Sequence, residues 1–421
     1  MALSLFQGFG IELEYMIVGR DDFAVRPIAD ELLRAAAGRW TGDFSDGSIE
    51  WSNELAAHVI ELKTNGPVPD LSGAAREFHR SLSRQQRLLE PMGARLLPSG
   101  MHPTMDPARE FVRWRHDYSE VYEAYDRIFD CRGHGWSNLQ SCHLNLPFAN
   151  DDEFARLHLS CRALLPLMPA LAAASPYCEG RFTGWLDYRI QAYRRNQDRV
   201  PRIAGSIVPE PVASRQEYYE TILEPIWRDI EPLDPERILR EEWLNSRGVV
   251  AKFFRDALEI RVLDCQESPF ADLAICVLIA ETLRALCAER WCPLAALKAL
   301  PTGELADLLL RVARDGDRAV VDHAGLLAAL GLPGSAIAAL DVWRRLADRV
   351  LPGGSPADPD LALPLDAILS RGPLARRMLE AAGPAPDREG LFRLCRGLAL
   401  CLEPEGPRSF PGRPGRPEPR R

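Results

Sequence analysis

Polar and apolar residues alternate with a period of two in four segments of the chain, at residues 10–18, 59–64, 141–146 and 257–263. Successive side chains of a β-strand point to opposite faces of a sheet, so this alternation is typical of strands with one apolar and one polar face. Residues 94–98 predict a further short strand. The pattern therefore predicts a sheet whose polar face collects side chains from several strands.

Between these segments, apolar residues recur at helical spacing. Helices are predicted at residues 26–39, 70–89, 153–174 and 271–290, and Asp70 stands where an N-cap is favoured. Residues 301–401 also have a largely helical pattern. Residues 175–208 place Gly, Pro, Arg and aromatic residues between regular elements, which is typical of a functional loop.

The last segment, residues 402–421, consists mostly of Pro, Gly and Arg and has almost no apolar residues. Such a segment buries too little apolar surface to offset the loss of conformational entropy on folding. We therefore expect a disordered tail.

Composition narrows the choice of function. The chain has 421 residues, 46% of them hydrophobic, and a formal net charge of −9, which argues against general binding to nucleic acid or anionic lipid. Residues 1–10 lack the features of a signal peptide. The longest apolar run, residues 270–287, contains Asp272, Glu281 and Arg284, so no membrane span is predicted. We expect a cytoplasmic protein that acts on small molecules, with its ten separate cysteines reduced.

Each alternating segment carries two polar residues spaced by two, which places both on one face of the strand. A solvent-exposed face would explain one such pair. Four charged or metal-ligating pairs instead predict an acidic face that needs cations, and carboxylate oxygens suit Mg²⁺ or Mn²⁺. The pairs are Glu12 with Glu14, Glu61 with Lys63, His143 with Asn145, and Glu259 with Arg261.

Divalent ions of this kind accompany nucleotide phosphates. The sequence contains no GxxxxGK[ST] loop, and the Gly8-Phe9-Gly10 segment lacks the third glycine of a dinucleotide-binding motif. A nucleotide held by metal ions and arginines on a sheet is therefore the interpretation that the residues favour.

These segments resemble, in the same order, the motifs of glutamate-cysteine ligases and related carboxylate-amine ligases. The resemblance spans roughly residues 8–300. It rests on GIELEY at 10–15, VIELKT at 59–64, GMHP at 100–103, SCHLN at 141–145, the loop that includes Ala174-Ser175-Pro176 and Tyr188-Arg189, and LEIRVLD at 258–264. Two positions depart from the pattern, because Lys63 brings a positive charge beside Glu61 and Met101 stands where a small polar residue is common.

The resemblance implies an α+β fold with a glutamine-synthetase-like catalytic domain over residues 1–300. This domain is expected to have a mainly antiparallel curved sheet with helices packed on one side, and residues 301–401 are expected to form a helical C-terminal part of the same unit. It also implies ATP as co-substrate and Mg²⁺ or Mn²⁺ as cofactor.

Site roles also follow from the resemblance. Arg261, with Glu259, is expected to act on the transferring phosphoryl group, since a planar guanidinium can donate two hydrogen bonds to one phosphate. The implied metal ligands are Glu12, Glu14, Glu61, His143 and Glu259. The implied substrate contacts are Arg189, Arg181, Asn145 and Glu54.

The implied reaction joins the side-chain carboxylate of glutamate to the amine of cysteine through an acyl phosphate. Three alternatives stay open: a ligase of this fold that joins another carboxylate and amine, a phosphotransferase that makes no amide, and a non-catalytic binding protein. The expected partners are ATP, glutamate and cysteine, with neither nucleic acid nor membrane, and a homodimer is compatible with the resemblance.

Overall fold

The computed structural model describes residues 3–117, 119–332 and 334–411. Its centre is an eight-stranded sheet in the order β2-β3-β4-β1-β6-β10-β9, with β5 paired to β1, and every paired strand is antiparallel. The strands are β1 Gly10–Gly19, β2 Asp43–Asp46, β3 Ile49–Asn53, β4 Val59–Thr64, β5 Ala94–Leu97, β6 Ser141–Pro147, β9 Val249–Lys252 and β10 Ala257–Asp264. The four alternating segments are thus four neighbouring strands of the sheet.

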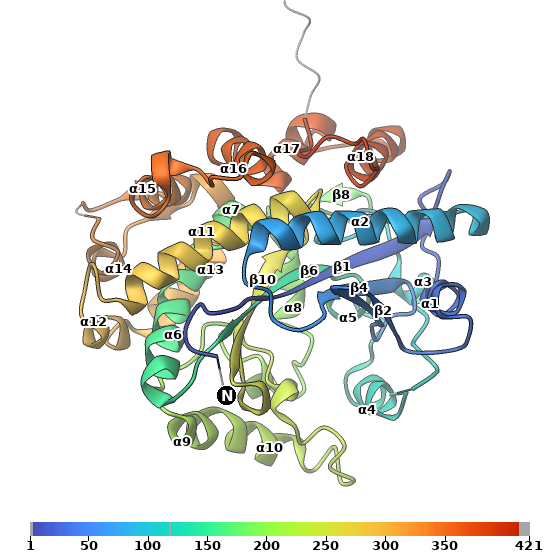
Figure 1. The fold of residues 1–421 in the computed structure, drawn as a ribbon. Coiled ribbons are helices and arrows are strands. Elements are labelled where there is room, and N and C mark those ends of the chain that lie inside the picture. Colours follow the sequence, from blue (N-terminus) through green and yellow to red (C-terminus); the bar gives the residue numbers. More distant parts are fainter. Residues whose placement is uncertain (1–2, 118, 333, 412–421) are drawn as a thin grey trace, which may run out of the picture.

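Two long helices, α2 (Leu71–Leu89) and α11 (Pro269–Cys287), cover the apolar face of this sheet (Figure 1). The apolar residues of β1, Ile11 and Leu13, are fully buried. Trp51 of β3 donates a hydrogen bond from Nε1 to Ser81 Oγ of α2, at 2.6 Å. The Asp70 side chain accepts a hydrogen bond from the Gly73 amide and caps α2, as the sequence predicts.

The opposite, polar face is bordered by shorter elements. They are α4 (Ser119–Phe129), α5 (His134–Ser137) and α8 (Tyr188–Tyr193), which lie on the other side of the sheet from α2 and α11 (Figure 1). The predicted loop at 175–208 contains α8 and a small hairpin, β7 (Tyr177–Cys178) with β8 (Arg181–Phe182). The α+β prediction, with an antiparallel sheet and long helices on one side, is confirmed.

Further helices fill the rest of the chain. The predicted helix at 153–174 is divided at its prolines into α6 (Asp151–Leu164) and α7 (Pro169–Ala172). The helical C-terminal region is confirmed and consists of α12 Leu294–Lys298, α13 Thr302–Asp315, α14 Ala324–Ala329, α15 Ala339–Val350, α16 Pro359–Arg371, α17 Leu374–Ala382 and α18 Arg388–Leu400. Within the described ranges, no helix combines the length and apolarity needed to span a membrane.

The prediction of disorder from residue 402 is wrong for residues 402–411. Leu402 and Phe410 are buried, and Arg377 Nη1 donates to the Phe410 carbonyl at 3.0 Å. Arg377 also forms a fully buried ion pair with Glu267, so the segment is anchored at a charged group as well as by two apolar side chains. Residues 412–421 of the predicted tail lie outside the described residues.

Candidate active site

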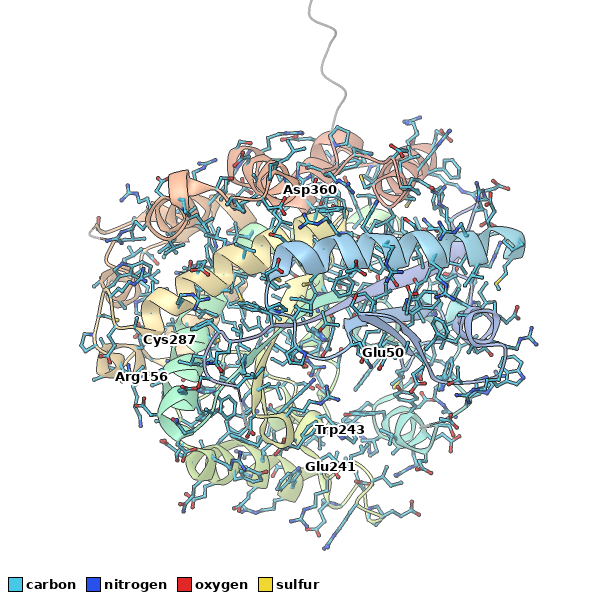
Figure 2. The ribbon with its side chains drawn as sticks, in the orientation of Figure 1. Glu50, Arg156, Glu241, Trp243, Cys287 and Asp360 are labelled. Carbon is cyan, nitrogen blue, oxygen red and sulfur yellow. The ribbon has the colours of Figure 1, made fainter. Side chains whose placement is uncertain are left out.

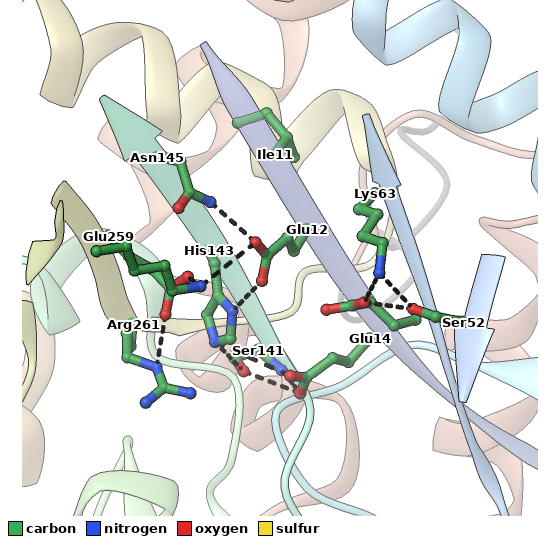
Figure 3. A network of polar contacts seen from close by, with 12 residues as sticks. Ile11, Glu12, Glu14, Ser52, Lys63, Ser141, His143, Asn145, Glu259 and Arg261 are labelled. Carbon is green, nitrogen blue, oxygen red and sulfur yellow. Dashed lines mark hydrogen bonds and ion pairs between the residues drawn. The ribbon is translucent and has the colours of Figure 1, made fainter. Parts of the chain in front are cut away.

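Strand register brings the four predicted pairs together on one face, and Figure 3 labels every member of these pairs except Glu61. Glu12 lies opposite Lys63 of β4 on one side and His143 of β6 on the other, while Glu14 lies opposite Glu61. On β10, Glu259 lies opposite Asn145. Alternation along each strand puts these side chains on the face away from α2 and α11.

Glu12, His143 and Glu259 form the tightest group on this face. One ligand atom from each lies within 4.8 Å of the other two. His143 Nδ1 is 2.8 Å from Glu12 Oε2, and Asn145 Nδ2 donates to Glu12 Oε1 at 3.1 Å. We call this group the triad. Among the described residues it is the one set of this kind.

The protonation of Glu12 and that of His143 depend on each other because the two side chains share a hydrogen bond. Burial would raise the pKa of Glu12, but the hydrogen bond with His143 and the positive charge of Lys252 hold it well below its usual range. Burial would lower the pKa of His143, but the hydrogen bond with Glu12 and the charge of Glu259 raise it. The pair therefore favours a carboxylate beside a readily protonated imidazole.

Two basic side chains flank Glu259, whose side chain is almost fully buried. Lys252 Nζ of β9 pairs with Glu259 Oε2, and it also lies 3.9 Å from Glu12 Oε1. Arg261 Nε is 3.0 Å from Glu259 Oε1 without hydrogen-bond geometry. Arg261 falls in an irregularity of β10 between Ile260 and Leu263, where a bulge re-aims side chains.

Glu14 lies next to the triad. Its Oε2 accepts hydrogen bonds from the Ser141 amide at 2.7 Å and the Ser141 hydroxyl at 2.9 Å. The same hydroxyl is 3.0 Å from His143 Nε2. Ser141 therefore links Glu14 to the histidine and fixes the position of both side chains.

Glu61, at the β4 end of the face, has different surroundings. Its Oε2 accepts hydrogen bonds from Ser52 Oγ at 2.5 Å and from Lys63 Nζ at 3.2 Å. Lys63 Nζ also lies 3.0 Å from Ser52 Oγ and 3.3 Å from Glu50 Oε1. Burial and the charge of Glu12 raise the pKa of Glu61. We call Glu50, Ser52, Glu61 and Lys63 the lysine cluster.

A cavity of about 420 Å³ opens beside Glu14, His143 and Arg261. Its other walls are largely apolar, and Trp243 lies on the polar side of the sheet (Figure 2). The aromatic rings in the walls come from α4, α5, α8 and the segment before β9, namely Tyr122, Tyr125, Trp136, Tyr193 and Trp243. No sequence motif predicts this group of rings, because only the fold brings them together.

A second cavity of about 590 Å³ lies at the other end of β1. Glu12, Lys63 and Asn145 line it, together with Phe254, which is 67% exposed, and Arg255. Gly8, Gly10 and Gly66 also border this space. The polar face therefore lies between two cavities, with Glu14 lining the first and Glu12 the second.

The predicted substrate contacts separate into two groups. Glu54 lines the first cavity, and burial together with the charges of Glu61 and Glu14 raises its pKa well above the usual range. Asn145 lies on the triad. Arg189 lines the first cavity, whereas the Arg181 side chain is 78% exposed, pairs with Glu179 and is not among the residues that line either cavity.

Arg189 is held from behind by Asp264. Its Nε pairs with Asp264 Oδ1, and its Nη2 donates to the Arg261 carbonyl at 3.1 Å. Asp264 Oδ2 also accepts from the Ala174 amide and the Ser175 hydroxyl, both at 2.7 Å. A Cβ on Gly100 would lie 2.4 Å from this carboxyl group. Three of the motifs that sequence analysis singled out therefore meet at one buried carboxylate behind the site.

The residues of the triad fit a divalent cation. Two carboxylates and an imidazole are suitable ligands for Mn²⁺, and carboxylates for Mg²⁺. Glu259 Oε1 is buried and, among the described residues, has no hydrogen-bond partner. Arg261 Nε lies 3.0 Å from this oxygen without hydrogen-bond geometry, so the oxygen keeps lone pairs with which it could bind a cation.

Comparison with known proteins gives the family to which this chain is similar. A family model described as glutamate-cysteine ligase family 2 matches residues 8–389. An uncharacterized protein of Archaeoglobus fulgidus is 38% identical over 309 residues, which cover 73% of this chain and 80% of the relative. Residues 8–389, the region that the family model matches, contain every strand of the polar face.

Two solved structures share the fold. The glutamate-cysteine ligase of Francisella tularensis, determined in complex with AMP, has a TM-score of 0.57 at 12% identity and covers 97% of this chain and 91% of its own. A bifunctional glutathione synthetase from Pasteurella multocida has a TM-score of 0.57 at 14% identity, covering 94% of this chain and 53% of its own. At these identities the likeness is one of fold.

Proposed function

Because the chain belongs to glutamate-cysteine ligase family 2, we propose that it is an ATP-dependent carboxylate-amine ligase that joins the side-chain carboxylate of glutamate to an amine. The single observation that carries this proposal is the triad, flanked by Arg261 and placed between two cavities. The second cavity gives room for a nucleotide, and the first, which Glu54 and Arg189 line, gives room for the carboxylate and amine substrates. The family name favours cysteine as the amine.

The proposed reaction has two steps. A carboxylate oxygen of the amino acid attacks the γ-phosphorus of ATP, and the bond from this phosphorus to the bridging oxygen breaks, so that ADP leaves. The amine nitrogen then attacks the acyl carbon of the acyl phosphate, inorganic phosphate leaves, and the nitrogen loses a proton. Catalysis of such transfers depends on positioning and on cations around the phosphate oxygens.

Side chains of this chain have distinct roles in the proposal. Glu12, His143 and Glu259, with Glu14 beside them, would hold Mg²⁺ or Mn²⁺, which supplies positive charge for the phosphate oxygens. Arg261 stabilises the transferring phosphoryl group, and burial, which would lower its pKa, is outweighed by Tyr193 and Glu259, which raise it. Arg189 holds a substrate carboxylate. Glu54 contacts the amine and takes its proton, consistent with its raised pKa.

The test is ADP release with ATP, glutamate and a panel of amines, followed by mass spectrometry of the product. The proposal expects ADP release that needs both co-substrates and a product whose mass is that of glutamate plus amine minus water. A stable phosphorylated product without an amide would favour the phosphotransferase, and binding without ADP release would favour the non-catalytic protein.

The aromatic lining of the first cavity favours a second candidate, a ligase for an amine that bears an aromatic group. Tyr125 lies between Trp136 and Trp243, with ring centroids at 4.9 and 5.9 Å. Trp136 Nε1 donates to the Asn196 carbonyl at 3.1 Å, which fixes the indole. Aromatic ligands bury much apolar area against such rings, whereas the small cysteine side chain would contact few of them.

The same amine panel separates the two candidates. It includes cysteine, alanine, phenylalanine, tryptophan and phenethylamine at equal concentration. A higher kcat/KM for the aromatic amines than for cysteine supports the second candidate, and a preference for cysteine supports the first. Replacing Trp243 by Leu should weaken use of the aromatic amines only, since it removes one wall of the ring cluster.

A further inference from the structure

Lysine is rare in this chain. Only three of its 51 basic residues are lysines, Lys63, Lys252 and Lys298, and the others are arginines. Two of the three lie on the acidic face, where Lys63 contacts Glu61 and Lys252 contacts Glu259. Both groups carry a positive charge, but an ammonium is a compact point charge and a guanidinium is a broad planar fork, so an ammonium fits a crowded carboxylate site more easily.

The two lysines differ in what surrounds them. Lys252 shares Glu12 and Glu259 with the triad, so its ammonium lies where ligand atoms already converge. Lys63 lies outside the triad, and its Nζ has three oxygen neighbours, from Glu50, Ser52 and Glu61, at 3.0–3.3 Å. Among the described residues, Glu61 does not belong to any group of three or more potential metal ligands that lie close together.

The face carries built-in positive charge close to its carboxylates. Glu61 is flanked by Lys63, Glu12 by Lys252, and Glu259 by Lys252 and Arg261. Carboxylates that already have a permanent cation gain less from a divalent ion, because the ion must displace or repel that cation. This limits how many divalent ions the face can take.

We propose that Lys63 holds the place of a divalent ion at Glu61, so that metal binding by this chain centres on the triad. This inference rests on the proposed ligase function for its meaning in catalysis. Its test does not, because the test counts bound ions and does not measure ligase activity. It deepens that function by assigning the positive charge at the β4 end to the protein instead of to a metal.

The test is equilibrium binding of Mn²⁺ to the full chain, measured from the electron paramagnetic resonance signal of free Mn²⁺. Lys63→Met keeps the length of the side chain and removes its charge, which frees Glu61, Glu50 and Ser52 for an ion. We expect Lys63→Met to bind one more Mn²⁺ per chain than the parent, and Lys63→Arg to keep the parent count. Adding Glu61→Gln to Lys63→Met should remove the extra ion.

Lys298→Met is the matched control, because Lys298 is the remaining lysine of the chain and its contact, with Glu217 at 3.6 Å, lies away from the face. It should leave the count unchanged. The proposal is overturned if Lys63→Met melts normally and binds the same number of Mn²⁺ ions as the parent. It is also overturned if the only effect of Lys63→Met is a weaker apparent affinity for ATP.

If Lys63→Met does not fold, Glu61→Gln in the parent chain decides the question. The proposal expects this variant to keep the parent number of Mn²⁺ ions, and the loss of an ion overturns it. These outcomes do not depend on ligase activity, so the failure of this inference and the failure of the proposed function are distinguishable.

Discussion

The two ends of the polar face use the same kinds of side chain but neutralise their carboxylates differently. At the triad, Glu12 and Glu259 converge with His143 and leave one buried oxygen without a hydrogen bond. In the lysine cluster, Glu61 is satisfied by Ser52 and Lys63. Both ends therefore contain a lysine, but only the triad adds a histidine and a carboxylate oxygen without a hydrogen bond, so acidic residues on adjacent strands have different surroundings.

The largest effect is expected at the triad. Glu259→Gln keeps the shape of the side chain and removes its charge, so it should abolish Mn²⁺ binding at the triad. Turnover should fall by more than about 100-fold, because the loss of a residue that only supports a metal ligand costs up to about 100-fold and Glu259 is proposed to be a ligand itself. Turnover is measured as ADP release, and folding by a thermal melt. Near-normal turnover of this variant would remove the triad from the mechanism.

Arg261 should have the next largest effect. Arg261→Lys keeps a positive charge but loses the planar fork, so it should lower kcat by about 10²- to 10³-fold while KM for ATP changes much less. Steady-state kinetics and a thermal melt are measured together. Unchanged kcat with a lower melting temperature would make Arg261 a structural partner of Glu259.

The sequence predicted which residues lie on the polar face but not how they are arranged there. Period-two alternation placed Glu12, Glu14, Glu61, His143 and Glu259 on strands and on one face, because the period is a local property. It did not predict that Glu12 lies opposite both His143 and Lys63, since register depends on how separate strands pair.

Other parts were missed for related reasons. Lys252 is the only polar residue of β9, a buried strand too short for a clear pattern. The aromatic wall of the first cavity combines residues more than a hundred positions apart. Arg189 was expected to bind substrate, and the structure adds the buried Asp264 that orients it. Anchoring of residues 402–411 was missed because composition does not show that Phe410 meets Arg377.

Glu61→Gln should have a smaller effect than Glu259→Gln, although the chemical change is the same. Lys63 keeps its contact with Glu50 after the change, so the local charge balance is only partly altered. We expect turnover to fall by about 10-fold or less, as for an outer-shell partner. The assay is again ADP release at saturating ATP. Equal loss in both variants would show that the two ends of the face act alike.

The smallest effect is expected for Lys252→Met. Lys252 pairs with Glu259 and approaches Glu12, so in the absence of a metal ion its ammonium neutralises the carboxylates of the triad. A divalent ion that binds there competes with this charge, and removing the ammonium should tighten Mn²⁺ binding by a few-fold, equivalent to roughly 1 kcal/mol, without adding an ion.

Lys63→Met is expected to have the opposite result, because it should add an ion at Glu61 with little change in Mn²⁺ affinity at the triad. Mn²⁺ titrations of the two variants, with Lys298→Met as control, measure both the number of ions and their affinity. If Lys252→Met instead gains an ion, this lysine, like Lys63, holds the place of a metal, and the contrast between the two ends of the face is lost.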